Sequence, residues 1–404
     1  MRRGMLSDLF TGVAAKRLTL VETDTARSNQ HEFQGTRPLK RLLGAEDRRR
    51  ISTRFIWLSG EQEAFTEDGF VSWSNVRKGK PRAPEYHLYY SGNAVTELMQ
   101  PGDILFLALQ RDGSILVIIT PSPTIQNQLL WLFNLEEQSE STFTFQEIDD
   151  AHNAELDFAA RYILDELGIE PEEPEANHLD TLIEQFGLEF PRTRIFSQLA
   201  RDSLPEVSAA DDPDRALIEW MDREEQLFRR LERRIVSARL ENGFCAPDGA
   251  DVDGFLSFSL SVQNRRKSRA GQALENHLEA VFDAQGISYK RGAETENRNR
   301  PDFLFPGQKE YHNPLFPEAR LTMPGAKSTL KDRWRQVLSE AERIRRKHLL
   351  TLEPGISENQ TDEMQVKQLQ LVLPRRLHDT YQPSQQAWLM DVAGFTELVR
   401  ARQL

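Results

Sequence analysis

The segment 168–177, GIEPEEPEAN, divides the chain into two parts with different patterns of apolar residues. Its two prolines exclude a regular helix, and its four glutamates without any basic residue disfavour a packed core. Apolar residues form short runs before this segment and recur at helical intervals after it. We therefore expect two domains, over residues 1–167 and 179–404, joined by an acidic linker over residues 168–178. Each domain is long enough to bury a core of its own.

The N-terminal domain is expected to be β-rich. Short apolar or aromatic runs occupy residues 55–58, 86–90, 104–109 and 115–120, and Asp112-Gly113 between the last two runs predicts a β-hairpin. Short strands with close turns predict a small barrel or sandwich. The stretch 73–82, WSNVRKGKPR, combines a tryptophan with four basic residues. This composition suits either a DNA-facing loop or a plain exposed loop.

The C-terminal domain is expected to have an α/β fold. Helical spacing covers residues 215–240 and 268–285, and the short extended stretches 287–290 and 303–305 follow the second of these. Long helices mixed with a few strands are typical of this fold class.

Composition excludes several classes of protein. The single cysteine, Cys245, cannot form an internal disulfide, and the sequence holds no Cys/His set with zinc-ligand spacing. No apolar run is long enough for a signal peptide or a membrane span, so we expect a soluble cytoplasmic protein. The net charge of −12 argues against nonspecific binding to nucleic acid, although basic residues gather at 264–269 and 343–348. Such clusters fit either a DNA-binding cleft or an uneven surface charge.

Two charged residues lie next to expected strands of the C-terminal domain. Asp302 follows Pro301 at the entrance to the apolar stretch 303–305, and Lys327 comes near the end of the extended stretch 320–328. Taken singly, such residues are usually a turn residue and a solvated strand end. Their interpretation therefore depends on the acids that neighbouring helices bring near them.

Two such acids are expected on helices. Thr329 and Asp332 form a capping-box-like start, so a helix is predicted from about residue 330 to residue 347. Glu340 and Arg333 border its apolar stripe, and Glu275 borders a similar stripe on the preceding helix. The stripe of the later helix comprises Trp334, Val337, Leu338, Ala341 and Ile344. Each acid alone could be an ordinary surface group.

Taken together, Glu275, Asp302, Lys327 and Glu340 are the groups that metal-assisted phosphodiester hydrolysis requires. Carboxylate oxygens bind Mg²⁺ while the ion keeps several waters. A lysine reduces the cost of forming hydroxide and of the negative charge on the pentavalent phosphorane. The set therefore predicts a Mg²⁺-dependent nuclease site.

Three segments of the C-terminal domain carry a resemblance to a known family. Residues 261–282 (SVQNRRKSRAGQALENHLEAVF), 300–312 (RPDFLFPGQKEYH) and 326–344 (AKSTLKDRWRQVLSEAERI) are similar to the catalytic domain of the EcoRII-like type II restriction endonucleases. The similarity extends over about residues 188–400. It implies a restriction-endonuclease-like PD-(D/E)xK core, with a mixed sheet flanked by helices, and an N-terminal pseudobarrel-like domain that binds DNA as an effector or autoinhibitory module.

The resemblance also implies roles for individual residues. Asp302 and Glu340 would be the metal ligands, Lys327 the catalytic lysine and Glu275 an accessory acid, while Tyr311 matches a family tyrosine near the active site. In this variant of the motif the second carboxylate has moved from a strand to the following helix, and Gly325 stands in its usual place. The aliphatic strand of the family is replaced here by Met323-Pro324-Gly325, so we expect this strand to be irregular or to lie at the margin of the sheet.

Two further groups of residues are implied to contact DNA. Lys331, Asp332 and Arg333 would read bases, since Lys and Arg donate to guanine and Asp accepts from cytosine. The basic run of Arg265, Arg266, Lys267 and Arg269 would contact backbone phosphates. A solvated charge run remains the alternative for this second group.

The expected function is that of a Mg²⁺-dependent type II restriction endonuclease. By resemblance it would act as a homodimer on double-stranded DNA, cut both strands at a CCWGG-like palindrome and leave staggered 5′-phosphate ends, with no membrane partner. A cognate cytosine methyltransferase is expected genetically rather than as a physical partner. The alternatives are a modification-dependent endonuclease, whose N-terminal domain senses altered bases, and a DNA-binding regulator that does not cleave.

Overall fold

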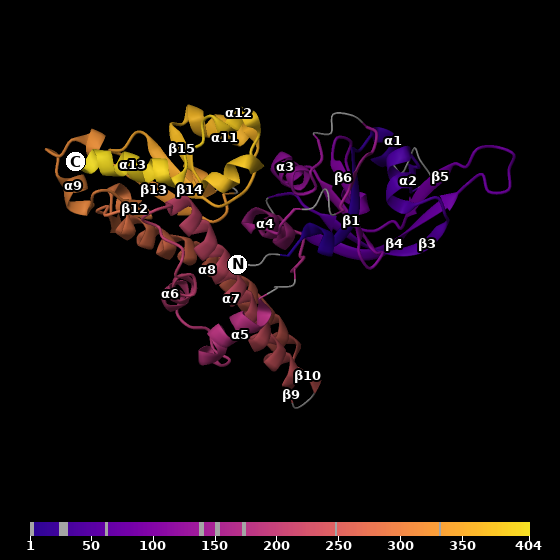
Figure 1. Cartoon of the computed structure of the whole chain (residues 1–404), viewed down its shortest axis with the longest axis horizontal. Coiled ribbons are helices and arrows are strands. Elements are labelled where there is room, and N and C mark those ends of the chain that lie inside the picture. Colours follow the sequence, from indigo (N-terminus) through magenta and orange to yellow (C-terminus); the bar gives the residue numbers. More distant parts are fainter. Residues whose placement is uncertain are drawn as a thin grey trace. The chain divides into compact units, whose positions relative to one another are not determined.

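The computed structural model describes residues 4–23, 31–60, 64–136, 141–149, 154–171, 175–246, 249–330 and 333–404 (Figure 1). The chain divides into two compact units. The first unit comprises Arg2–Glu172 with Pro354–Ser357, and the second comprises Glu173–Glu353 with Glu358–Leu404. No helix within the described ranges is both long and apolar enough to cross a membrane.

The first unit is built on one eight-stranded sheet with the strand order β2-β5-β4-β3-β7-β6-β1-β8. All neighbouring strands are antiparallel except β3 and β7, which run parallel. The strands are β1 (Phe10–Arg17), β2 (Glu32–Gln34), β3 (Arg48–Trp57), β4 (Phe65–Asn75), β5 (Tyr86–Tyr90), β6 (Ile104–Gln110), β7 (Ile115–Thr120) and β8 (Thr144–Glu147). The expected β-rich domain is therefore confirmed, including the hairpin at Asp112-Gly113 that joins β6 to β7.

Alternation of apolar side chains places a core on each face of this sheet. In β6, Ile104 and Phe106 belong to the core that α3 (Pro123–Leu132) and α4 (Phe158–Glu166) cover. Leu105 and Leu107 belong to the opposite core, which includes side chains of α2 (Arg37–Leu43). Because successive residues of a strand point to opposite faces, a continuous apolar run such as β6 is buried on both.

The stretch 73–82 does not present its aromatic residue to solvent. Trp73 is fully buried, stacks on Tyr86 with ring centroids 5.0 Å apart, and donates its indole N–H to the Gly44 carbonyl at 3.0 Å. The interpretation of Trp73 as part of a DNA-facing loop is therefore wrong, since a core tryptophan cannot stack on bases. Lys80 and Arg82 are exposed.

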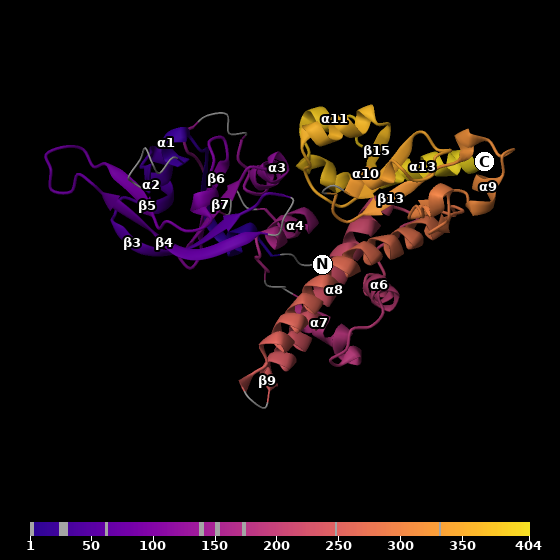
Figure 2. The ribbon, with the colours of Figure 1, turned by 180° about the vertical axis from the view of Figure 1, so that it is seen from behind.

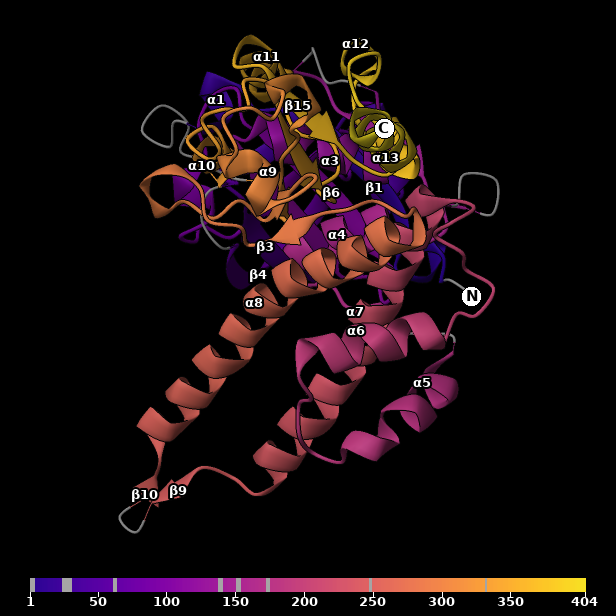
Figure 3. The ribbon, with the colours of Figure 1, turned by 90° about the vertical axis from the view of Figure 1, so that its left-hand side faces the viewer.

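The second unit begins with helices α5 (Ala176–Ile183), α6 (Thr193–Asp202), α7 (Pro213–Glu241) and α8 (Val252–Ala284). Helices α7 and α8 lie side by side as an antiparallel pair, joined through the short strands β9 (Cys245–Ala246) and β10 (Gly249–Ala250) (Figure 3). The sequence predicted only the second half of α8. Its first half lacks a buried stripe, because Val252, Leu256 and Leu260 are all more than half exposed.

Two small sheets follow these helices. Strands β11 (Lys290–Arg291) and β12 (Phe303–Leu304) pair antiparallel, whereas β13 (Pro324–Lys327), β14 (Lys347–Thr351) and β15 (Leu369–Val372) form a parallel sheet in that order. An antiparallel bridge between Phe305 and Thr322 connects the segments that contain β12 and β13. The expected position of Pro324-Gly325 at a sheet margin is confirmed, because β13 is an edge strand whose missing proline donor disturbs only one ladder.

Helices pack around this parallel sheet (Figure 2). Helices α8 and α10 (Trp334–Val337) contact β13, and α11 (Glu358–Val366) contacts β15. The short helices α9 (Gln308–His312) and α12 (Pro383–Gln386) and the C-terminal helix α13 (Val392–Gln403) complete the unit. This arrangement of strands and helices confirms the expected α/β class.

Aromatic side chains fix the strand that leads into the predicted site. Phe282 of α8 packs edge-on against Phe303 and Phe305, with ring centroids 5.2 and 5.1 Å apart, and all three rings are fully buried. Phe395 of α13 closes the cluster at 5.9 Å from Phe305. Burial of large aromatic rings contributes strongly to core stability. The cluster therefore ties β12 to α8.

The helix predicted over residues 330–347 is wrong. The structure has α10 only over Trp334–Val337, and residue 347 begins strand β14. After α10 the chain makes three successive tight turns with backbone bonds to the residue three positions earlier, and Ala341 then adopts a left-handed φ of 49°. Tight turns place every third residue on one side, which explains why Trp334 and Val337 are both buried, as the helical pattern also required.

Candidate active site

Asp302 and Lys327 form an ion pair where β12 and β13 come together. The Lys327 ammonium and the backbone N–H of Ala326 each donate to Asp302 Oδ2 at 2.7 Å. Both charged side chains are about four-fifths buried, at 17% and 20% exposed. Because one carboxylate oxygen accepts from both the strand and its lysine, the end of β13 fixes the direction of each side chain. Lys327 is therefore directed at Asp302 despite the Pro324-Gly325 sequence before it.

Glu340 lies in the turn after α10 rather than on a helix. Its carboxylate is partly buried, and Oε2 has no hydrogen-bond partner among the described residues. Burial is the main cause that raises the Glu340 pKa to about 7, and the nearby Asp302 carboxylate raises it further. Lys327 and Lys347 act in the opposite direction. A buried oxygen without a partner, held near another carboxylate, is suited to accept a cation.

Glu275 on α8 joins the same electrostatic cluster. Burial raises its pKa, the Arg291 guanidinium at 2.6 Å opposes this effect, Asp302 adds to it and Lys327 lowers it. Arg291 also binds Glu279 at 2.8 Å, so the arginine spans one turn of the helix. The structure therefore brings Glu275, Asp302, Lys327 and Glu340 together from α8, the start of β12, the end of β13 and the turn after α10.

The donors fit a divalent cation held by two carboxylates. Within the described ranges, no three His, Cys, Asp or Glu side chains form a group that could hold a metal ion. Asp302 and Glu340 nevertheless offer the oxygen ligands that Mg²⁺ prefers, and this ion commonly uses only one or two protein carboxylates and keeps its remaining waters. Glu275 is already paired with Arg291. Of the four clustered residues, only Asp302 and Glu340 therefore fit the role of ligands to a divalent cation.

Gly325 stands where helix α10 comes closest to β13. A Cβ atom at this position would lie 2.6 Å from Val337 Cγ2 and 3.3 Å from Val337 Cγ1. Val337 is fully buried and cannot turn away into solvent. The glycine is thus needed for close packing of helix on strand, two residues before Lys327.

The predicted base-reading residues can be followed only in part. Lys331 and Asp332 lie outside the described residues. Arg333 is exposed and precedes the first residue of α10. Its base-reading role stays a prediction.

The basic run on α8 is mostly engaged within the protein. Arg265 lies 4.4 Å over the Phe190 ring, and Arg266 donates to Glu232 at 2.7 Å. Lys267 is exposed, and its phosphate contact stays a prediction. Arg269 requires a correction, because it is 7% exposed, pairs with Glu224 and Glu225, and lies 4.2 Å over the Phe228 ring. A phosphate contact by Arg269 would leave two carboxylates without their buried cation, so we remove it from the DNA-contacting set.

Sequence reasoning missed Lys347 and Glu296. Lys347 is 8% exposed, burial lowers its pKa, and its ammonium donates to the Leu338 carbonyl at 2.8 Å. The helical pattern places it at the end of the expected helix, although the apolar residues 349 and 350 that follow it indicate a buried strand. Glu296 accepts the Tyr311 hydroxyl at 2.5 Å, and nothing in its polar loop distinguishes it from neighbouring acids.

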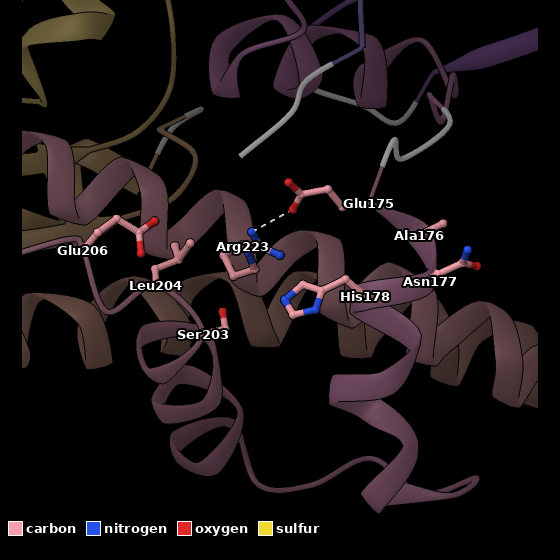
Figure 4. A pocket seen from close by; sticks show the side chains of 8 residues that line it. All are labelled: Glu175, Ala176, Asn177, His178, Ser203, Leu204, Glu206 and Arg223. Carbon is pink, nitrogen blue, oxygen red and sulfur yellow. Dashed lines mark hydrogen bonds and ion pairs between the residues drawn. The ribbon is translucent and has the colours of Figure 1, made fainter.

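Two cavities of the second unit do not contain these residues. One of about 420 Å³ lies among the helices, where Arg223 donates to Glu175 at 3.1 Å beside His178 and Ser203 (Figure 4). Another, of about 490 Å³, lies between α6, α7 and α8. Neither is lined by Glu275, Asp302, Lys327 or Glu340. The carboxylate cluster is therefore distinct from both.

Comparisons with known proteins match the part of the chain that contains the carboxylate cluster. The family described as EcoRII C terminal matches residues 228–396, a range that includes all four clustered residues. The type II restriction enzyme EcoRII from Escherichia coli is 38% identical over 229 residues, which are 56% of this chain and 55% of that enzyme. The chain thus spans about half the length of this curated relative.

Two solved structures show a weaker likeness. Metal-depleted Ecl18kI in complex with uncleaved, modified DNA has a TM-score of 0.43 and 19% identity, over 56% of this chain and 84% of that one. The complex of restriction endonuclease PspGI with substrate DNA has a TM-score of 0.44 and 13% identity, over 53% and 93%. By sequence, residues 228–396 are similar to the EcoRII C-terminal family.

Proposed function

We propose that this protein is a site-specific DNA endonuclease of the type II restriction class. The observation that carries the proposal is the Asp302–Lys327 ion pair beside the buried, unpartnered Oε2 of Glu340, all within the matched domain. Two carboxylates with one lysine are suited to phosphodiester hydrolysis. Because the chain spans only about half of its curated relative, the activity and the substrate both belong to the proposal.

Asp302 and Glu340 would hold Mg²⁺, which supplies charge stabilisation at the phosphate and a water of lowered pKa. Lys327, directed by its bond to Asp302, assists deprotonation of the water that attacks the scissile phosphate in line. Its positive charge also stabilises the developing phosphorane. Glu275 acts as an accessory acid, held in place by Arg291.

Recognition is proposed to follow the same resemblance. Lys331, Asp332 and Arg333 read adjacent G·C pairs, while Arg265, Arg266 and Lys267 contact the phosphate backbone, the first two after leaving their partners on the protein. The site is CCWGG-like and cleavage leaves staggered 5′-phosphate ends. A palindromic site read by identical protein surfaces favours a homodimer with two active sites.

The two domains are proposed to have different functions. Residues 179–404 form the catalytic domain, residues 168–178 the linker, and residues 1–167 a DNA-binding or effector domain. The protein acts in the cytoplasm, where a cytosine methyltransferase encoded nearby protects the host DNA.

Digestion of a defined unmethylated plasmid, with Mg²⁺ or with EDTA, tests the proposal. The parent protein should cut only with Mg²⁺, and sequencing of the ends should show the site and the stagger. Lys327→Ala should bind the cleaved site as tightly as the parent but lose cleavage, because it removes the charge beside the phosphate while leaving the DNA-contacting residues in place. The exposed Lys309→Ala is the matched control and should cut at the parent rate.

Normal cleavage by Lys327→Ala would refute the assigned site. A parent protein that binds DNA specifically but never cuts would instead be the regulator. Cleavage restricted to methylated plasmid would identify the modification-dependent enzyme.

A further inference from the structure

The turn that carries Glu340 needs support from outside itself. Outside a helix, Glu340 has no continuous ladder of backbone bonds to fix it, and the next residue, Ala341, has a left-handed φ of 49°. Non-glycine residues in this conformation cost free energy and persist where surrounding contacts impose them. The contacts on each side of Glu340 therefore decide where its carboxylate lies.

Two side chains hold the backbone before Glu340. Asn299 Nδ2 donates to the Ser339 carbonyl at 2.9 Å, and Lys347 Nζ donates to the Leu338 carbonyl at 2.8 Å. These carbonyls lie at the end of α10, where no further helical turn provides donors. Side-chain donors thus end the helix and fix the direction in which the chain leaves it.

Two more side chains hold the backbone after Glu340. The N–H of Glu342 donates to Glu296 Oε2 at 3.3 Å, and the N–H of Arg343 donates to the Tyr311 hydroxyl oxygen at 3.3 Å. The same hydroxyl donates its own proton to Glu296 Oε2 at 2.5 Å. Glu296 and Tyr311 therefore act as one unit, in which a carboxylate and a phenol together bind two successive backbone N–H groups.

The supports from Glu296 and Asn299 come from the loop that leads into Asp302. Residues 297 and 298 of this loop also have left-handed φ values, 58° and 61°. They set the turn that points Glu296 and Asn299 at the chain around Glu340. The loop that ends at Asp302 therefore donates a hydrogen bond to the backbone before Glu340, through Asn299, and accepts one from the backbone after it, through Glu296.

We infer that Glu296, Asn299 and Tyr311 form a clamp that positions Glu340 relative to Asp302. This inference rests on the proposed function, because that function requires Asp302 and Glu340 to hold one cation together. None of the three side chains is assigned as a ligand. They are positioning residues, and they act by fixing the turn over residues 338–343.

Loss of the clamp should weaken metal binding more than folding. Partners that orient metal ligands typically change metal affinity by roughly 10- to 100-fold when they are removed. Tyr311→Phe deletes the hydroxyl that joins Glu296 to the Arg343 N–H. Glu296→Ala deletes the acceptor of the Glu342 N–H and leaves the Tyr311 hydroxyl without the carboxylate that orients it. We expect each variant to bind Mn²⁺ at least about 10-fold more weakly than the parent. Glu296→Gln, which keeps an acceptor oxygen, should stay close to the parent.

Isothermal titration calorimetry with Mn²⁺ alone, on DNA-free full-length protein, measures this affinity without relying on catalysis. Tyr289→Phe is the matched control, because Tyr289 also donates its hydroxyl to a carboxylate, that of Asp283 at 3.0 Å, and takes no part in the clamp. Both tyrosine variants should melt at similar temperatures. Only Tyr311→Phe should lose Mn²⁺ affinity, and its specific DNA binding in EDTA should equal that of the parent.

Two results would overturn the clamp. Parent-like Mn²⁺ affinity in Tyr311→Phe and Glu296→Ala, in a protein that cuts DNA, would refute the clamp and leave the proposed function standing. A parent protein that neither binds Mn²⁺ nor cuts DNA would refute both. If Glu296→Ala does not fold, Asn299→Ala tests the clamp from its other side, and unchanged Mn²⁺ affinity there would also count against it.

Discussion

Replacement of Gly325 by alanine is a sharp test of the packing between β13 and α10. The new methyl group would lie 2.6 Å from Val337 Cγ2, whereas carbon atoms pack at about 3.5 to 4.0 Å, so helix and strand must separate by roughly 1 Å. Overpacking of a filled core typically costs about 1 to 3 kcal/mol. We expect Gly325→Ala to lower the free energy of unfolding by an amount in this range.

The same displacement of β13 should also move Lys327 and slow cleavage. Gly325 is followed by Ala326 and Lys327, whose N–H and ammonium both bind Asp302 Oδ2. A misplacement of about 1 Å near reacting groups can reduce a rate by roughly 100-fold. Cleavage by Gly325→Ala should therefore slow by much more than its loss of folded population explains, while specific DNA binding is retained.

The assay combines urea unfolding with single-turnover cleavage. It compares the parent, the single variants Gly325→Ala and Val337→Ala, and the double variant Gly325→Ala/Val337→Ala. Val337→Ala removes the two methyl groups that the new side chain would strike. The double variant should be more stable than the sum of the single effects predicts, with a coupling of about 1 kcal/mol or more. Additive effects, or an unfolding midpoint for Gly325→Ala equal to that of the parent, would refute the packing argument.

Two further predictions concern pH. Glu340 has a folded pKa of about 7, above its ordinary value of 4.5, so the free energy of unfolding in metal-free buffer should fall as pH rises between these two values. Glu340→Gln cannot ionise and should remove this loss, which amounts to at most about 3 kcal/mol. Melting temperatures of both proteins at pH 5 and pH 8 measure the difference. Burial, with a smaller contribution from Arg402, lowers the pKa of the fully buried His348 to about 3. Its neutral form therefore favours folding at high pH, and this contribution is lost as pH falls below 6.5, by about 2 kcal/mol at pH 5. His348→Phe should flatten that acid limb, and an unchanged limb would exclude His348 as its source.

The N-terminal sheet was predictable where burial is continuous. Strands β6 and β7, which are apolar except for their last residues, are predicted nearly to the residue, because both faces of each strand are covered. Strand β4 was missed, since its first residues alternate between exposed and partly buried and include Glu67, Asp68 and Gly69. Trp73 misled the interpretation of its stretch, because sequence does not show that Tyr86 and Gly44 take up its ring and its N–H.

The carboxylate cluster was predictable by residue but not by conformation. The order of Asp302, Lys327 and Glu340 along the chain identified the candidates, and the structure brings them together. The turn that holds Glu340 was mistaken for a helix, because tight turns and an α-helix bury similar positions. Its supports come from Asn299 and Lys347, on other segments of the chain, and a local pattern cannot reveal such contacts.

The contact between Gly325 and Val337 also constrains how this sequence can evolve. While valine occupies position 337, any side chain at position 325 is selected against, including the carboxylate that a standard motif would carry there. A change to that arrangement needs a smaller residue at 337 first, and a variant with only this replacement loses core contacts. A single substitution that places a carboxylate at 325 is therefore disfavoured, and variants selected for the proposed cleavage should keep glycine at 325 together with an acid at 340.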